Sequence, residues 1–214
     1  MRKRYEEQLG ELHAALIQMG EMIRRAIQGA VHALLVRDDD KAREIIAFDE
    51  EIDRQERLVE GLCMRLLLCQ QPVATDLRTV SSALKVITDM ERIGDHAADI
   101  SEIELMLESL PRMTCGHLKE MATQTCVMLL ESLQAFVDGD TQRARSVIGM
   151  DDAVDALFLA VKRELIEAIH SDPQMGEQAT DLLMAAKYFE RIGDHATNIA
   201  EWAIYAATGE HVQE

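Results

Sequence analysis

The sequence predicts an all-α protein made of two pseudo-symmetric antiparallel three-helix bundles, with six long helices, packed side by side. Its 214 residues are 48% hydrophobic but only 4% aromatic and include 3 Pro, a mixture that suits helix packing better than a sheet. Apolar residues recur every three or four positions over many turns, as on the buried face of a helix. Several motifs occur twice, which indicates that a helical unit was duplicated.

Three helices are expected in the first half of the chain. The first carries apolar residues at three-four spacing over residues 9–34 and should end near Arg37. Residues 38–40 are all Asp, which suits a turn followed by the N-cap of a second helix. That second helix should end within residues 70–74, because Pro72 disfavours helical geometry in the residue before it.

The third helix should begin at Thr75 or Asp76, and Leu110 and Pro111 mark the boundary after it. The second half repeats this plan, with Gly139 at its first turn and a second break before its last helix. The helices expected there cover residues 116–137, residues 141–169 and a last stretch that ends near residue 208.

The duplication is visible in the spacing of two motifs. The stretch E-R-I-G-D-H-A occupies residues 91–97 and again 190–196, an offset of 99. The Asp-x-x-x-Asp pair of residues 49–53 recurs at 151–155, an offset of 102. The second copy has therefore lost three residues between its last two helices. The two predicted domains are residues 1–110 and 111–214.

The charge balance limits the classes of partner. The chain has 22 basic and 39 acidic side chains, and 22 − 39 gives a net charge of −17. Such a surface repels nucleic acid and anionic lipid, because binding to phosphates depends on Lys and Arg. Metal cations and basic protein surfaces are the natural partners, and direct nucleic-acid binding is not expected.

The chain is expected to be cytoplasmic. Its N-terminal stretch places acids where a signal peptide needs an apolar run, and no apolar stretch approaches the ~20 residues that span a bilayer. Membrane insertion is therefore not expected. The four cysteines form no C-x-x-C pair and lie in apolar stretches, which predicts reduced thiols in the core. These are Cys63, Cys69, Cys115 and Cys126.

The acids of E-R-I-G-D-H-A are predicted to face solvent. A helix turns about 100° per residue, so Asp95 and Asp99 lie about 40° and 80° from Glu91. The apolar residues of the same helix lie roughly opposite, about 180° to 260° from Glu91. Glu190 and Asp194 repeat this arrangement in the second half.

A second acidic stripe runs along the preceding helix of each half, from Asp49 and from Asp151. Crowded carboxylates raise each other's pKa values, and a hard or borderline divalent metal, or iron, relieves that repulsion. The alternative is a solubilising surface, which is the usual role of a single acidic stripe. Repetition on adjacent helices in both halves favours metal. The candidate ligands are Asp49, Asp53, Glu91, Asp95, Asp99, Asp151, Asp155, Glu190 and Asp194.

The two halves are not equivalent at these stripes. The second half has lost three acids and gained one cation, through the exchanges of Asp99 to Asn198, Glu56 to Phe158 and Glu60 to Lys162. The first half should therefore bind metal more tightly.

His96 and His195 lie at the flank of the core stripe and are expected to be packed or surface residues. Gly94 and Gly193 each lower helix stability by roughly 1 kcal/mol, so a close helix crossing should require them.

The doubled E-R-I-G-D-H-A, D-E-E-I-D at 49–53, D-D-A-V-D at 151–155 and Q-P-V-A-T-D-L-R at 71–78 together resemble the PhoU family. The resemblance covers nearly the whole chain. It implies two three-helix bundles and multinuclear surface metal clusters, with iron, zinc or other divalent ions, held by the Asp/Glu-x-x-x-Asp motifs already listed. Asn198 departs from the all-acid pattern.

The function that the resemblance implies is regulatory and non-enzymatic. Proteins of this family restrain the sensor histidine kinase of the phosphate starvation response when phosphate is plentiful. The ATPase subunit of the phosphate ABC importer is a further implied partner. The resemblance also implies that the protein limits phosphate uptake. The exposed acid stripes also invite a metal-bridged homodimer.

Two other functions are weighed against this one. A carboxylate-bridged di-iron or di-manganese oxidoreductase needs Glu-x-x-His on two inward-facing helices, and this sequence offers one such spacing, Glu167 to His170, at a helix end. No nucleophile elbow or phosphate-binding loop is present. The other alternative is a structural helical bundle that binds no metal and has no role in the phosphate response.

Overall fold

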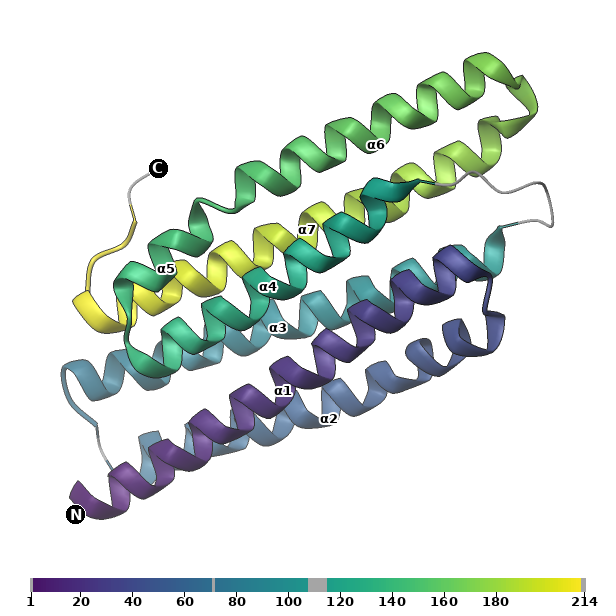
Figure 1. The fold of residues 1–214 in the computed structure, drawn as a ribbon. Helices are drawn as coiled ribbons and strands as arrows, with labels where there is room; N and C mark the ends of the chain where they lie inside the picture. Colours follow the sequence, from purple (N-terminus) through teal and green to yellow (C-terminus); the bar gives the residue numbers. More distant parts are fainter. Residues whose placement is uncertain (1, 71, 108–114, 213–214) are drawn as a thin grey trace.

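The computed structural model describes residues 2–70, 72–107 and 115–212, and every regular element in these ranges is helical (Figure 1). The expected boundary at Leu110 and Pro111, and with it the division between the two predicted domains, lies outside the described residues. None of the described helices is long and apolar enough to cross a membrane. The elements are α1 (Arg2–Val36), α2 (Asp39–Gln70), α3 (Thr75–Met106), α4 (Gly116–Asp138), α5 (Thr141–Ile148), α6 (Asp151–Ser171), the 3₁₀ helix η1 (Pro173–Met175) and α7 (Gly176–Thr208).

The turn that follows the first helix is built the same way in both halves. Asp38 and Asp140, which are 102 residues apart, each accept hydrogen bonds from backbone N–H groups of the next helix, at 2.9 Å in the first half and 3.0 Å in the second. The residues before them, Arg37 and Gly139, both have positive φ, at 59° and 65°. The same left-handed turn is thus made once with arginine and once with glycine.

One expected helix is interrupted. Residues 141–169 were predicted to form a continuous helix, and the structure instead divides this segment into α5 and α6 at Gly149 and Met150. The Met150 amide bonds to the Val147 carbonyl at 2.9 Å, which is the tighter i+3 pattern. The equivalent position of α2 is Ala47, and glycine costs roughly 1 kcal/mol relative to alanine inside a helix. The six-helix plan stands, with its fifth helix broken.

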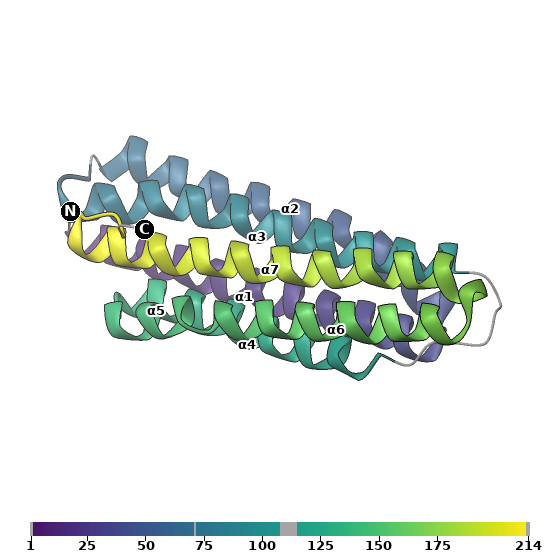
Figure 2. The same ribbon diagram turned by 90° about the horizontal axis from the view of Figure 1, so that it is seen from above.

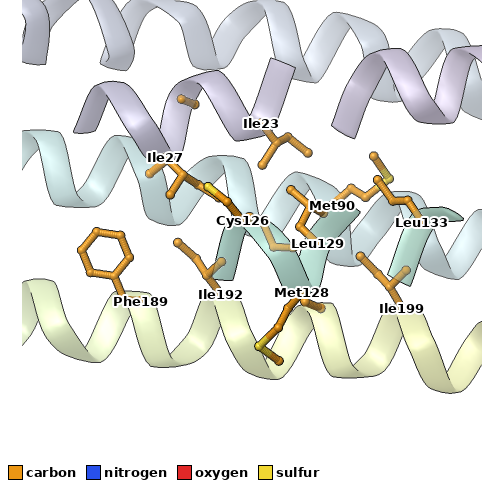
Figure 3. Packing of buried hydrophobic residues seen from close by; sticks show 14 of the residues in the cluster. Ile23, Ile27, Met90, Cys126, Met128, Leu129, Leu133, Phe189, Ile192 and Ile199 are labelled. Atoms are coloured by element: carbon orange, nitrogen blue, oxygen red, sulfur yellow. The ribbon is translucent and has the colours of Figure 1, made fainter. Parts of the chain in front are cut away.

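The two halves share one core. Helix α1 packs on α3, α3 on α7, α7 on α4 and α4 on α1, so these four helices form a closed ring. Helices α2 and α5–α6 flank the ring on opposite sides (Figure 2). Buried side chains from all four central helices meet inside it (Figure 3). These include Ile23, Ile27, Met90, Leu129, Phe189 and Ile192.

The predicted core stripe is confirmed, since Met90, Ile93 and Ala97 have no exposed surface. One prediction about the cysteines is wrong. Cys63, Cys115 and Cys126 are buried, but Cys69 is exposed in the last turn of α2. An apolar stretch at the end of a helix therefore does not guarantee burial there.

Candidate functional site

The first acidic cluster consists of Asp49 and Asp53 on α2 with Glu91, Asp95 and Asp99 on α3. These two helices pack side by side, so the two stripes predicted from the sequence are brought together. All five side chains are half-buried. They face away from the core, as predicted, but the neighbouring helix removes part of their surface from water.

Asp49 is the deepest acid of this cluster because Gly94 lets α2 approach α3. The Oδ1 atom of Asp49 is buried and has no hydrogen-bond partner. A Cβ atom placed on Gly94 would lie 3.3 Å from that oxygen and 3.1 Å from Cγ2 of the buried Ile52. The prediction that Gly94 permits a close helix crossing is therefore confirmed.

Burial and the charges of neighbouring acids disfavour the charged forms of Asp49, Glu91 and Asp95. Burial, followed by the charges of Asp95, Asp53 and Asp99, raises the pKa of Asp49 to about 6. Burial and then Asp95 also raise the pKa of Glu91, and burial raises that of Asp95 although Arg92 opposes it. Arg92 contacts Asp95 at 3.2 Å. Arg92 also lies 3.6 Å from Glu91, and Arg57 lies 3.8 Å from Asp53. Two exposed arginines therefore compensate part of the negative charge of the five acids.

The second acidic cluster consists of Asp151 and Asp155 on α6 with Glu190 and Asp194 on α7. The crossing at Gly193 is looser than that at Gly94: an added Cβ would lie 3.4 Å from Asp151 Oδ1, an ordinary contact, so the prediction that Gly193 is required for a close crossing is not confirmed. Burial, then Asp194 and Asp155, raise the pKa of Asp151. Asp155 and Asp194 are exposed, so this cluster is more open to water than the first.

A lysine already compensates the second cluster. Lys187 forms an ion pair with Glu190, and its ammonium group lies 5.6 Å from the ring centre of Phe158. At an offset of 99, the residue equivalent to Lys187 in the first half is Thr88, which has no charge. Lys187 is thus a difference in charge between the halves that the acid count did not reveal, and the tighter binding of metal by the first half stays a prediction.

The residues of the first cluster fit a cation. A buried carboxylate oxygen without a partner and neighbouring acids with raised pKa values form a site in which added positive charge is favourable. Carboxylate oxygens are the ligands that hard divalent ions prefer. As the side chains stand, no group of three or more His, Cys, Asp or Glu within the described ranges is arranged to hold a metal ion. The metal clusters stay a prediction.

The sequence did not reveal the role of the residues at the seam between α3 and α7. His195 Nδ1 lies 2.9 Å from Asp89 Oδ1, and Asn198 donates its amide to the same oxygen at 3.1 Å. Asn198 is therefore explained by its partner, because an aspartate there would face the carboxylate of Asp89. The sequence did contain one clue. At an offset of 99, the residue equivalent to Asp89 is Tyr188, so Asp89 is an acid that the repeat does not duplicate.

The arrangement argues against di-metal oxidoreductase chemistry at the single Glu-x-x-His spacing. Glu167 and His170 are both exposed near the end of α6. Carboxylate-bridged enzymes place such residues inside a four-helix core. In this protein the inside of the four-helix ring is filled by buried apolar side chains.

Comparisons with known proteins agree across the whole chain. The family model for the PhoU domain matches residues 16–103 and again residues 118–203. The chain is 37% identical over 213 residues to a phosphate-specific transport system accessory protein PhoU homolog of Clostridium acetobutylicum, covering 99% of this chain and 97% of that protein. A homolog of the same name from Pseudomonas aeruginosa is 32% identical, covering 99% of this chain and 88% of that protein.

Solved structures share the fold. The crystal structure of the phosphate transport system regulatory protein PhoU from Streptococcus pneumoniae superposes with a TM-score of 0.90 at 30% identity, covering 98% of this chain and 100% of that chain. PhoU from Pseudomonas aeruginosa gives a TM-score of 0.89 at 32% identity, covering 96% of this chain and 100% of that chain.

Proposed function

The chain belongs to the PhoU family, and from that premise we propose that it is a negative regulator of the phosphate starvation response and of phosphate uptake. The observation that carries the proposal is the match of the PhoU domain to both halves of the chain. Its relatives are named as accessory or regulatory proteins of phosphate transport. In this proposal the protein is not an enzyme and acts through contacts with other proteins.

The proposed partners are the sensor histidine kinase of the phosphate response and the ATPase subunit of the phosphate ABC importer. We place the protein in the cytoplasm, where these partners expose their catalytic domains. A net charge of −17 suits docking on basic protein surfaces. The long, charged outer faces of α2 and α6 offer one surface in each half, which would let a single chain engage two partners.

We further propose that both acidic clusters hold divalent metal or iron, with iron or zinc favoured. In the first half the ligands would be Asp49, Asp53, Glu91, Asp95 and Asp99, and in the second half Asp151, Asp155, Glu190 and Asp194. The metal would supply the positive charge that allows these carboxylates to stay ionised. Because the outer parts of both clusters are accessible, a metal-bridged homodimer is an extension of the same proposal.

The test is alkaline phosphatase activity in a deletion strain of the source organism grown with ample phosphate. Deletion should raise the activity, and the wild-type gene should restore repression. The double variant Asp49→Ala/Asp95→Ala should fail to restore it. Glu50→Ala/Glu51→Ala, which removes two exposed acids from α2 outside the cluster, is the matched control and should restore it.

Unchanged low activity after deletion would remove the regulatory proposal. Full repression by the Asp49→Ala/Asp95→Ala variant would retain regulation but separate it from the acidic cluster. Direct contact is tested in vitro by pull-down of the purified kinase domain and ATPase subunit with the same variants.

A further inference from the structure

A groove lies between α1 and α4, on the side of the four-helix ring opposite the α3–α7 seam. The two helices are in tight contact near Gly20, where an added Cβ would overlap the Cδ1 atom of Leu133. Toward the end of α1 and the start of α4 they leave a cavity of about 520 Å³. It extends along residues 24–36 of α1, which is roughly 18 Å of helix at about 1.5 Å per residue.

The walls of this groove are mostly apolar and include side chains that are exposed without a partner. Leu35, Ala122 and Leu130 line it, together with Val36 and Val127, which are 57% and 42% exposed. Exposed apolar side chains that converge on a concave surface indicate a binding site more often than isolated ones do. The volume lies within the range of small-molecule pockets, roughly 300 to 1,000 Å³.

The charge of the lining is opposite to that of the protein. Arg24, His32 and Lys119 line the groove, and no acid does so within the described part of the chain, although acids outnumber basic residues by 39 to 22 overall. A local site of this kind attracts an anion out of an otherwise repulsive field.

The uncompensated positive charge is at one end. Arg24 is held by Glu21 at 2.7 Å and by the Gln28 amide oxygen at 2.9 Å. Lys119 is exposed and forms no ion pair with any other residue that the structure describes. It lies in the first turn of α4, where the helix dipole is also positive. The groove thus has a cationic end at Lys119 and an apolar remainder.

We propose that this groove binds a small anionic amphiphile, a linear alkyl chain with one carboxylate or sulfate head, such as a medium-chain fatty acid. The head would pair with Lys119, and the chain would cover Leu35, Val127 and Leu130 along the groove. The charge complementarity at one end and the apolar walls of matching length favour this occupant. The site is separate from both acidic clusters, and the proposal does not depend on the regulatory function.

The test is isothermal titration calorimetry of the full-length protein with dodecanoate below its micelle concentration. Dodecanoate should bind with one-to-one stoichiometry, and dodecyltrimethylammonium, with the same chain and the opposite charge, should bind at least about tenfold more weakly. Thr123→Trp fills the groove from an exposed position and should weaken dodecanoate binding at least about tenfold. Far-UV circular dichroism checks that this variant is folded.

Lys119→Glu should also weaken binding about tenfold. The matched control is Lys162→Glu, an equal charge change at an exposed position of α6, which should leave the affinity unchanged. The proposal is overturned by the absence of saturable binding, by binding that Thr123→Trp leaves intact, or by equal losses in the two lysine variants. A dimer that Thr123→Trp dissociates, without dodecanoate binding, would assign the groove to a second copy and also overturn the proposal.

Discussion

The imidazole rings of His96 and His195 lie 5.6 Å apart, centre to centre, where α3 meets α7. These residues occupy the same place in the two copies of the repeated motif, so their contact marks the pseudo-twofold relationship of the halves. The acids of each copy face outward beside α2 or α6, and the histidines meet at the seam. One short motif therefore supplies two acids of each cluster and a contact between the repeats.

The first prediction concerns the seam. Asn198→Asp should lower the free energy of unfolding at pH 7 by about 1 to 2 kcal/mol, because the Asp89 carboxylate loses a donor and gains a like charge. Urea unfolding at pH 7 measures this. Asp99→Asn, the reverse change at the equivalent position, is the control and should have a smaller effect.

The second prediction separates the two motif glycines. Gly94→Ala should lower stability by about 1 kcal/mol, because its Cβ would press on Ile52, which is buried and cannot yield. Gly193→Ala should be neutral or stabilising, since its nearest contacts are at 3.4 Å and alanine favours the helix. Thermal unfolding of the two variants compares them directly, and equal losses at both positions would contradict the crossing geometry.

The third prediction follows from the raised pKa of Asp49. Its folded-state pKa of about 6 lies above the model-peptide value of 3.8, so the folded protein binds the proton more tightly. The contribution of this group to stability is therefore present at low pH and is lost as pH rises through about 4 to 6. Asp49→Asn should stabilise the metal-free protein at pH 7 by about 1 kcal/mol after allowance for solvent screening.

That gain should vanish near pH 4, where wild-type Asp49 is largely protonated in the folded state. Glu50→Gln, the same carboxyl-to-amide change at an exposed position of the same helix, is the matched control. Denaturation of chelator-treated protein at a series of pH values provides the measurement. A gain that persists at pH 4 would mean that the carboxylate is not the cause.

The fourth prediction concerns metal and the inequality of the clusters. Metal content measured by elemental analysis should fall in Asp49→Ala/Asp95→Ala protein relative to wild type. A chelator should remove metal from the second cluster first, because Lys187 already compensates it. Lys187→Thr, which introduces the first-half residue, should reduce the difference. Removal of metal from the first cluster before the second would contradict this assignment.

The fifth prediction compares the effect on stability of replacing two glycines of the second half by alanine. Gly139→Ala should lower stability by about 1 kcal/mol, because alanine is strained at a φ of 65°. Gly149→Ala should raise stability by about 0.4 to 1 kcal/mol, because φ there is −71° and alanine is compatible with it. Differential scanning calorimetry of the two variants gives the signs, which should be opposite.

The sequence by itself determined the helices, the duplication and the outward direction of the acid pairs. These features depend on local rules: apolar spacing, proline and aspartate at helix ends, and the fixed rotation per residue. The close crossing at Gly94 could also be foreseen, since glycine inside a helix requires a compensating contact. The break at Gly149 was missed because the apolar pattern continues across it.

Only the tertiary structure decided which faces of different helices meet. In the repeat pattern Asn198 is a lost acid, whereas in the structure it donates to Asp89 on another helix. Lys187 likewise lies over the ring of Phe158 on α6. The exposure of Cys69 and the groove between α1 and α4 likewise depend on where neighbouring helices end or diverge. Helix periodicity is fixed within a few residues, whereas the partner of a helix face is chosen by packing between segments about 100 residues apart.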